Sequence, residues 1–249
     1  VYAQGSFGGT STLRGLAGFP LVVPVPGDGG QPFQPIHADD LAETVARCLA
    51  GPARRTLDPV GPETLTLRDM LGKLRAWLDL PPVPVLRVPM PLVRAVARLG
   101  DLTGTGPMRS TAVAQMVYGN VSDPAAFERA AGFRPRAMDD ELRRAPSHVQ
   151  DRWHARLYFL RPVLTAILVL LWIGSGIAGL VEPPSGGEAL LAALGVPELM
   201  AGRAAVPFGL ADIAIGALLA TGWRPRLMGV VQLGLVAFYT VVLTVIAPA

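Results

Sequence analysis

The sequence predicts an α/β domain followed by an all-α bundle of transmembrane helices. Up to residue 148, charged residues recur every few positions, and Pro and Gly separate short segments with strand-like or helical spacing. From Val163 to Val181 no residue is charged, and a helix of this length crosses about 30 Å of hydrocarbon. We therefore place the two domains at residues 1–148 and 149–249.

The first segment predicts a strand end at Val1-Tyr2, then a glycine-rich turn and a short helix. The buried face of this helix would include Leu13, Leu16 and Phe19. The glycines lack the spacing of a phosphate-binding loop, so we expect a plain turn.

The stretch PFQPIHADDLAETVARCLAG predicts an extended segment and then a helix. Either Asp39 or Asp40 is suited to cap the helix. Leu41, Val45 and Leu49 repeat at four-residue intervals, which predicts its buried face.

A short strand is expected at 54–60, and Thr66 with Asp69 then forms a capping-box pattern that begins a helix. The inward residues of this helix would be Met70, Leu71, Leu74 and Leu78. The proline-bounded VPVLRVP predicts an edge strand. Further helices are expected at 90–100, 109–118 and 124–131, the last with Asp123 as its cap and Pro124 at its first position.

The second half predicts three membrane spans, at about 157–181, 204–223 and 227–246. Between the first two, EALLAALGVPELM is too short and interrupted to cross, so an interfacial helix or loop is expected. Arginines gather before the first span and between the second and third, at positions 152, 156, 161, 224 and 226. By the positive-inside rule the protein would be a multi-pass protein of the inner (cytoplasmic) membrane, with the soluble domain in the cytoplasm.

Composition excludes several classes of function. The net charge is only +3, and no basic run or aromatic platform suggests nucleic acid. The single cysteine, Cys48, excludes an internal disulfide and agrees with a reducing compartment. His148 and His154 do not have a metal-ligand spacing, so no metal site is expected.

The chain begins without Met and ends as a hydrophobic span finishes, so we expect a fragment truncated at both ends.

Several segments together support a family resemblance. Val1-Tyr2 with its glycine-rich turn, FQPIHADDLAETV, GPETLTLRDML and NVSDPAAFERAAGFRPRAMDDEL occur in this order over residues 1–145. They resemble the C-terminal half of an extended or atypical short-chain dehydrogenase/reductase, and look similar to bacterial NAD(P)-binding proteins related to the accessory nucleotide-binding subunit of respiratory complex I. The resemblance implies a partial Rossmann-like fold, its C-terminal, substrate-side portion.

The second half resembles the DoxX-like membrane family, through LRPVLTAILVLLWIGSGIAGL and FGLADIAIGALLATGWRPRLMGVVQLGLVAFYTVVLT. Members of that family usually have four spans, which implies a fourth span beyond Ala249.

The resemblance to dehydrogenases implies NAD(P) as cofactor, but its main binding residues are absent. Residues 1–148 contain no G-x-G-x-x-G, and no Tyr in the chain has Lys four positions on. The nucleotide fingerprint would therefore lie upstream of this fragment, which alone is not expected to be active.

The resemblance places Tyr2 and Gln4 near the nicotinamide end of the cofactor, although a strand end and turn that only pack would explain both equally. Arg14 would meet an anionic substrate group or lie on a solvated helix face. Gln34 and His37 fall at a strand-to-helix turn, where ligands often bind. His37 would bind substrate or hold the turn as a buried histidine. No catalytic residue is assigned.

Asp212 lies in the middle of the second predicted span, where a charge costs roughly 2.5 kcal/mol or more unless it faces protein or water. It shares one helix face with Ala205, Gly209, Gly216 and Ala220. We expect it to point into the bundle and to pair with Arg161, Gln232 or Tyr239. It would either stabilise the bundle or mark a polar site for a quinone or a proton relay.

These observations lead to a membrane-anchored, NAD(P)H-dependent oxidoreductase that passes hydride to a quinone or another small lipophilic acceptor. The alternative is a non-catalytic nucleotide-binding module for assembly or redox sensing at the membrane. A purely membrane-embedded redox partner is disfavoured, because the predicted spans contain no His or Cys for a metal or haem.

Overall fold

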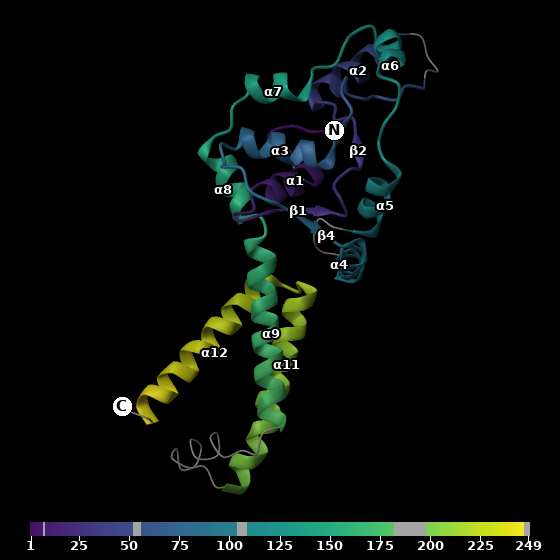
Figure 1. Ribbon diagram of the computed structural model, residues 1–249. Helices are drawn as coiled ribbons and strands as arrows, with labels where there is room; N and C mark the ends of the chain where they lie inside the picture. Colours follow the sequence, from purple (N-terminus) through teal and green to yellow (C-terminus); the bar gives the residue numbers. More distant parts are fainter. Residues whose placement is uncertain (7, 52–55, 104–108, 182–197, 247–249) are drawn as a thin grey trace. The chain divides into compact units, whose positions relative to one another are not determined.

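The chain forms two compact units, Val1–Leu160 and Arg161–Ala249, which we call the first and second unit. The computed structural model describes residues 1–6, 8–51, 56–103, 109–181 and 198–246 (Figure 1). Most of the described residues are helical, and each of their sheets has two strands. The structure therefore agrees with a mixed first unit and a helical second unit, but does not confirm a Rossmann-like portion.

The first unit contains eight helices and four strands among its described residues. The helices are α1 (Gly9–Ala17), α2 (Ala38–Ala50), α3 (Leu67–Trp77), α4 (Met90–Thr103), α5 (Ser110–Tyr118), α6 (Pro124–Ala131), α7 (Met138–Arg144) and α8 (Val149–Leu157). The strands are β1 (Val23–Pro26), β2 (Pro32–Phe33), β3 (Leu65–Thr66) and β4 (Val85–Val88).

Strand pairing in the first unit joins distant segments. β1 pairs in parallel with β4, and β2 pairs antiparallel with β3. A parallel bridge joins Tyr2 to His37, with Tyr2 N donating to Ile36 O and Ala38 N donating to Tyr2 O. The start of the chain is thereby fixed directly beside the start of α2. Residues 56–60 are not a strand, and the remainder of the strand expected at 54–60 lies outside the described residues.

Helix α3 confirms its sequence pattern. Thr66 Oγ1 accepts from Asp69 N, and the Asp69 carboxylate accepts from Thr66 N, which completes the capping box. The inward residues Met70, Leu71, Leu74 and Leu78 are all buried in the main hydrophobic core. The caps of α6 are also confirmed, because Asp123 accepts from Ala125 N and Pro124 follows it.

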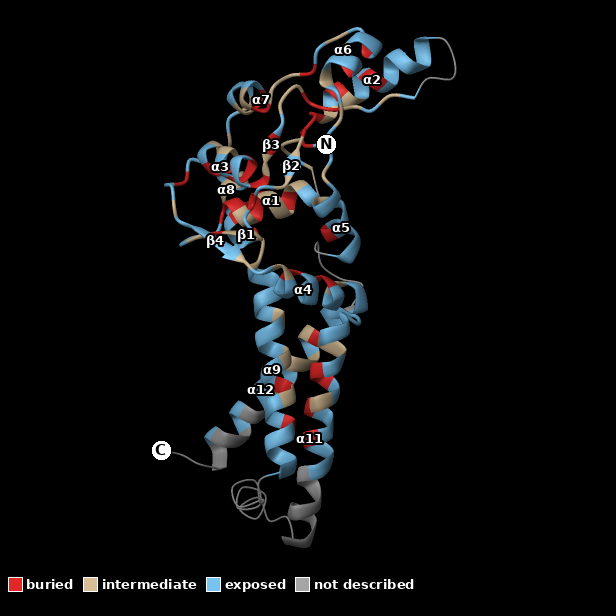
Figure 2. Cartoon of the chain, turned by 45° about the vertical axis from the view of Figure 1, so that its right-hand side comes forward, coloured by how far each residue is buried: buried red, intermediate tan, exposed pale blue. Residues whose placement is uncertain are grey.

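The main core of the first unit lies between α1, β1 and α3, with α8 packed closely on α1 (Figure 2). The close approach depends on glycine: a Cβ on Gly15 would lie 2.6 Å from Tyr158 Cδ1, and one on Gly18 would lie 2.7 Å from Ala155 Cβ. The expected apolar face of α1 is confirmed in part. Leu13 and Leu16 are half-buried and pack against the main core, whereas Phe19 lies beyond the helix and is 36% exposed.

The apolar spacing in α2 gave a wrong prediction. The buried residues of this helix are Asp40 and Thr44, whereas Val45 and Leu49 are 52% and 83% exposed. The helix is also not capped by an aspartate. His37 is its N-cap, because Nδ1 accepts from Asp39 N at 3.3 Å.

The second unit contains α9 (Leu160–Val181, beginning at the last residue of the first unit), α11 (Glu198–Thr221) and α12 (Pro225–Ile246). One helical stretch of the described chain, Val149–Val181, is long enough to cross a membrane and contains an 18-residue window with a mean hydropathy of 2.3. The apolar parts of α11 and α12 in the described chain, Val206–Thr221 and Pro225–Phe238, are shorter. The segment expected to be interfacial lies mostly outside the described residues.

Glycines bring α9 and α11 into close contact. A Cβ on Gly176 would lie 2.5 Å from Gly209 O, and one on Gly216 would lie 2.6 Å from Ile173 Cγ1. Gly209, Asp212 and Gly216 are buried, which confirms the expected small-residue face for these positions. Gly174, Gly176 and Gly179 have the G-x-G-x-x-G spacing, but they lie inside a helix rather than at a phosphate-binding turn, and Gly176 is the one that packs closely on α11.

We expect Gly176→Ala to destabilise the packing of α9 on α11 by about 1–3 kcal/mol, because the new methyl group overlaps the backbone of α11. Thermal unfolding in detergent micelles would measure the loss. Gly174→Ala is the control, since a Cβ there meets no atom within 4 Å. Equal melting temperatures for the two variants would contradict this packing.

Candidate functional site

A large cavity of the first unit has a volume of about 1030 Å³. Apolar side chains make up much of its lining, including Leu13, Leu16, Phe33, Val60, Val93 and Met116. Its polar lining residues include Gln34, Asn120 and Ser122. The described lining contains no Arg or Lys, so the cavity suits a largely apolar ligand with a few hydrogen-bonding atoms.

Tyr2 and Gln34 are the candidate residues from the sequence that line this large cavity. Gln34 is 9% exposed, and its Oε1 accepts from Ser122 N at 2.6 Å. This bond ties the segment after β2 to the segment before α6. A parallel bridge from Phe33 to Asn120 lies beside it.

A second cavity, of about 20 Å³, shares Tyr2 with the large cavity. Tyr2, Gln4, Arg14 and His37 all line it, together with Glu141 and other residues. Its volume is enough for about one water molecule. The structure therefore divides the sequence candidates between two cavities, and only the larger has room for a substrate.

The polar candidates around the small cavity are held by bonds within the protein. Gln4 Nε2 donates to Ala145 O. Arg14 is only 5% exposed, so it does not lie on a solvated helix face. Its NH2 donates to Ser6 O at 2.8 Å, and its NH1 lies 3.8 Å from Asp151 Oδ1. Burial lowers the pKa of Arg14, and the nearby Asp151 charge opposes this.

The sequence analysis did not predict the charged cluster that surrounds His37. Arg136 lies at the centre of this cluster. Arg136 N and Nε donate to the two oxygens of Asp40 at 3.0 and 2.9 Å. Arg136 NH1 donates to Glu141 Oε2 at 2.8 Å. The hydrogen bond to Asp40 raises the pKa of Arg136, with the Asp40 and Glu141 charges adding to it.

His37 lies inside this cluster and is 7% exposed. Its Nδ1 accepts from Asp39 N and lies 3.3 Å from Arg136 NH2. Because Nδ1 is an acceptor, the ring proton belongs on Nε2, which lies 3.8 Å from Glu141 Oε1. Both ring nitrogens thus face protein groups.

Tyr2 packs edge-on against His37, with ring centroids 5.2 Å apart. Its phenol oxygen is buried and has no hydrogen-bond partner among the described residues. Burial, followed by the Glu141 and Asp40 charges, raises the pKa of Tyr2 well above its ordinary value. The phenol is therefore protonated at physiological pH and is a hydrogen-bond donor rather than a base.

In the second unit, Asp212 is 9% exposed and accepts a hydrogen bond from Ser175 Oγ at 3.0 Å. None of the three expected partners is seen in the described chain. Gln232 Oε1 accepts from Trp172 Nε1 at 2.9 Å, and Arg161 shows no bond to Asp212 there. The side chain of Tyr239 lies outside the described residues. Ser175 and Trp172 thus provide polar links from α9 to α11 and α12.

No group of three or more His, Cys, Asp or Glu residues suited to a metal ion occurs in the described ranges.

The DoxX-like family matches residues 169–249. No curated protein matches the chain. The family match supports the DoxX-like part of the resemblance, and it does not extend to the part that resembles dehydrogenases. Together with the apolar stretch Val149–Val181, it indicates that the chain is a membrane protein with a DoxX-like C-terminal region.

We expect Asp40→Asn to loosen the segment from Arg136 to Glu141, because an amide replaces the carboxylate that accepts two bonds from Arg136. A local loss of about 2 kcal/mol would speed hydrogen exchange of the α7 amides roughly 30-fold. Mass spectrometry of the protein in nanodiscs would measure this. Asp39→Asn is the control, since its side chain is 76% exposed, and exchange equal to that of Asp40→Asn would argue against the cluster.

Proposed function

We propose that this chain binds a small lipophilic acceptor, such as a quinone, in the large cavity of its first unit. In this proposal it belongs to a membrane-anchored NAD(P)H-dependent oxidoreductase. The observation that supports it is the cavity itself. About 1030 Å³ is at the upper end of the range for small-molecule sites, and the lining is mainly apolar, with neutral polar groups and the carboxylate of Asp58.

Quinone head groups match this lining. They have two carbonyl acceptors on an apolar ring, and Gln34, Asn120 and Ser122 supply neutral amide and hydroxyl groups at the wall. A lipophilic acceptor is also concentrated at the bilayer, to which this membrane protein is anchored.

The cavity does not fit NAD(P) by itself. A dinucleotide has a charged diphosphate, and no Arg or Lys is among the described residues that line the cavity. We therefore assign no nucleotide to this cavity, and no reaction step is derived through it.

The second candidate function is non-catalytic nucleotide binding for assembly or redox sensing. It is favoured by the internal bonding of the polar candidates. His37 caps α2, Arg14 bonds to backbone and Asp151, and the raised pKa of Tyr2 prevents it from acting as a base. No described side chain is thereby assigned a proton-transfer role.

The multi-pass topology belongs to the same proposal. The helices α9, α11 and α12 have 22, 24 and 22 residues, each enough to span about 30 Å. Arg224 and Arg226 lie at the α11–α12 connection, and Arg152, Arg156 and Arg161 lie at or near the start of the first span. The positive-inside rule then puts the first unit and this connection in the cytoplasm.

Asp212 has two roles in this proposal, of which the first is the bond that joins α11 to α9 through Ser175. The second is a polar site within the membrane for the acceptor or for a proton. If only the bond matters, Asp212→Asn would keep activity, because an amide oxygen still accepts from Ser175.

We expect decylubiquinone, used as a probe, to quench the tryptophan fluorescence of the protein in liposomes saturably. Met116→Trp should fill part of the cavity and weaken binding about tenfold, equivalent to roughly 1.4 kcal/mol. Tyr118→Phe is the control, since Tyr118 is 89% exposed and does not line the cavity. Unchanged affinity of Met116→Trp would refute binding in this cavity.

Nucleotide binding is tested separately, on the protein expressed from its complete reading frame. Oxidation of NADH or NADPH that depends on the quinone would support the oxidoreductase. Nucleotide binding without oxidation would support the second candidate, and binding of the quinone alone would reject any nucleotide-dependent role.

A further inference from the structure

Helix α4 has an apolar stripe that its own unit does not cover. Val93 and Ala97 are buried, at 4% and 1% exposed, and belong to a small core with Val113 of α5. Leu92, Val96 and Leu102 are 55%, 45% and 83% exposed. Successive helical residues lie about 100° apart, so these three occupy a second face beside the buried one.

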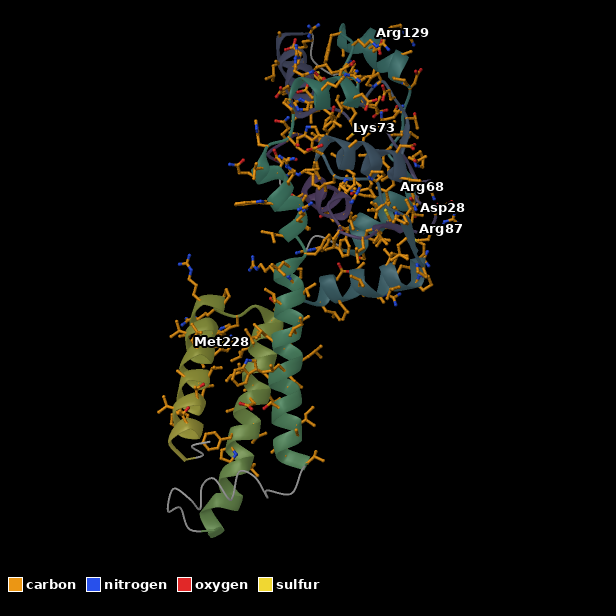
Figure 3. The ribbon with its side chains drawn as sticks, turned by 60° about the vertical axis from the view of Figure 1, so that its left-hand side comes forward. Asp28, Arg68, Lys73, Arg87, Arg129 and Met228 are labelled. Carbon is orange, nitrogen blue, oxygen red and sulfur yellow. The ribbon has the colours of Figure 1, made fainter. Side chains whose placement is uncertain are left out.

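Two arginines border this exposed stripe. Arg94 and Arg98 are exposed and lie one turn apart on α4, between the buried face and Leu102. Neither forms an ion pair with a described residue. Arg87 of β4 is different, because it lies near Asp28 and lowers the pKa of that carboxylate after the larger effect of Gly30 N–H (Figure 3). We therefore assign only Arg94 and Arg98 to the charged border of the stripe.

The stripe lies at the end of the first unit from which the chain leaves. In Figures 1 and 2, α4, β4 and the C-terminal end of α8 lie at one end of this unit, and α2 and α6 lie at the other. The α9 helix begins at Leu160, and the uncharged run begins at Val163, about 4.5 Å further along a helix. This end of the unit is therefore tethered within a few residues of the bilayer.

We propose that α4 lies in the membrane interface, with Leu92, Val96 and Leu102 among the upper acyl chains and Arg94 and Arg98 at anionic headgroups. An amphipathic helix with arginines beside its apolar face binds a bilayer in this way. The tether makes this contact intramolecular, so a short stripe is sufficient. The inference depends on membrane anchoring and is independent of the ligand in the large cavity.

A similar stripe on α2 lacks the features that favour lipid. Val45 and Leu49 are exposed there, but Arg47 pairs with Glu43 at 2.6 Å, so the flanking charge is neutralised. This helix also lies at the other end of the unit (Figure 1). Position 49 is therefore a matched control for position 96.

The test uses the whole chain in liposomes of phosphatidylcholine and phosphatidylglycerol, with Cys48→Ser to remove the native thiol. An environment-sensitive fluorophore is attached to Val96→Cys or, as control, to Leu49→Cys. We expect lipids that have a nitroxide near the headgroup to quench position 96 about twofold, since interfacial helices lie 5–10 Å deep, and to leave position 49 unquenched. Replacing Arg94 and Arg98 by Gln should lower the ratio of membrane-bound to unbound α4 about fivefold for each arginine replaced.

Equal, weak quenching at both positions would overturn the proposal. Protection of position 96 from aqueous iodide without quenching by nitroxide lipid would also overturn it, because protein rather than lipid would then cover the stripe. An arginine effect that is the same in liposomes of phosphatidylcholine alone would reject recognition of anionic headgroups.

Discussion

The arrangement of the first unit around Tyr2 depends on the pairing of Arg136 with Asp40 and Glu141. The Arg136 side chain is only 27% exposed, so its guanidinium group needs charged partners. Asp40 of α2 and Glu141 of α7 provide them. Asp40 also accepts from Arg136 N, so both backbone and side chain of Arg136 are fixed to the first turn of α2. His37 and Tyr2 are positioned beside the same cluster, and Tyr2 lines both the small and the large cavity.

The two cavities differ in the charge of their linings. Arg14, His37 and Glu141 line the small cavity and are held by polar groups of the protein, whereas Asp58 is the charged side chain among the described residues that line the large cavity. Buried charges are costly unless paired, so this separation stabilises the unit and leaves the large cavity suited to an apolar ligand. The same separation weakens the case for proton transfer by Tyr2 or His37. Ligand binding and turnover are thus separate questions for this protein, and the cavity bears mainly on the first.

Local signals in the sequence predicted local structure well. The Thr66–Asp69 capping box and the spacing of its helix lie within a few residues, and both are confirmed. The face of α2 could not be predicted from apolar spacing, because its buried residues are Asp40 and Thr44 and the partner of Asp40 lies 96 residues away. In the second unit, the cost of a charge in the membrane correctly predicted that Asp212 is buried. Its partner Ser175 was missed, since a neutral serine leaves no comparable signal.

The two exposed stripes show what the fold adds to such patterns. Leu92 and Val96 on α4, and Val45 and Leu49 on α2, both have four-residue apolar spacing that ordinarily indicates a buried face. Position distinguishes them: α4 lies at the end of the unit where the chain leaves for the membrane, and α2 lies at the other end. Arg94 and Arg98 of α4 form no ion pair with a described residue and add the charge that an anionic surface attracts, whereas Arg47 is already paired with Glu43. Apolar spacing therefore indicates only that another surface packs on the helix. For α4, the surrounding charge and the path of the chain indicate that this surface is lipid.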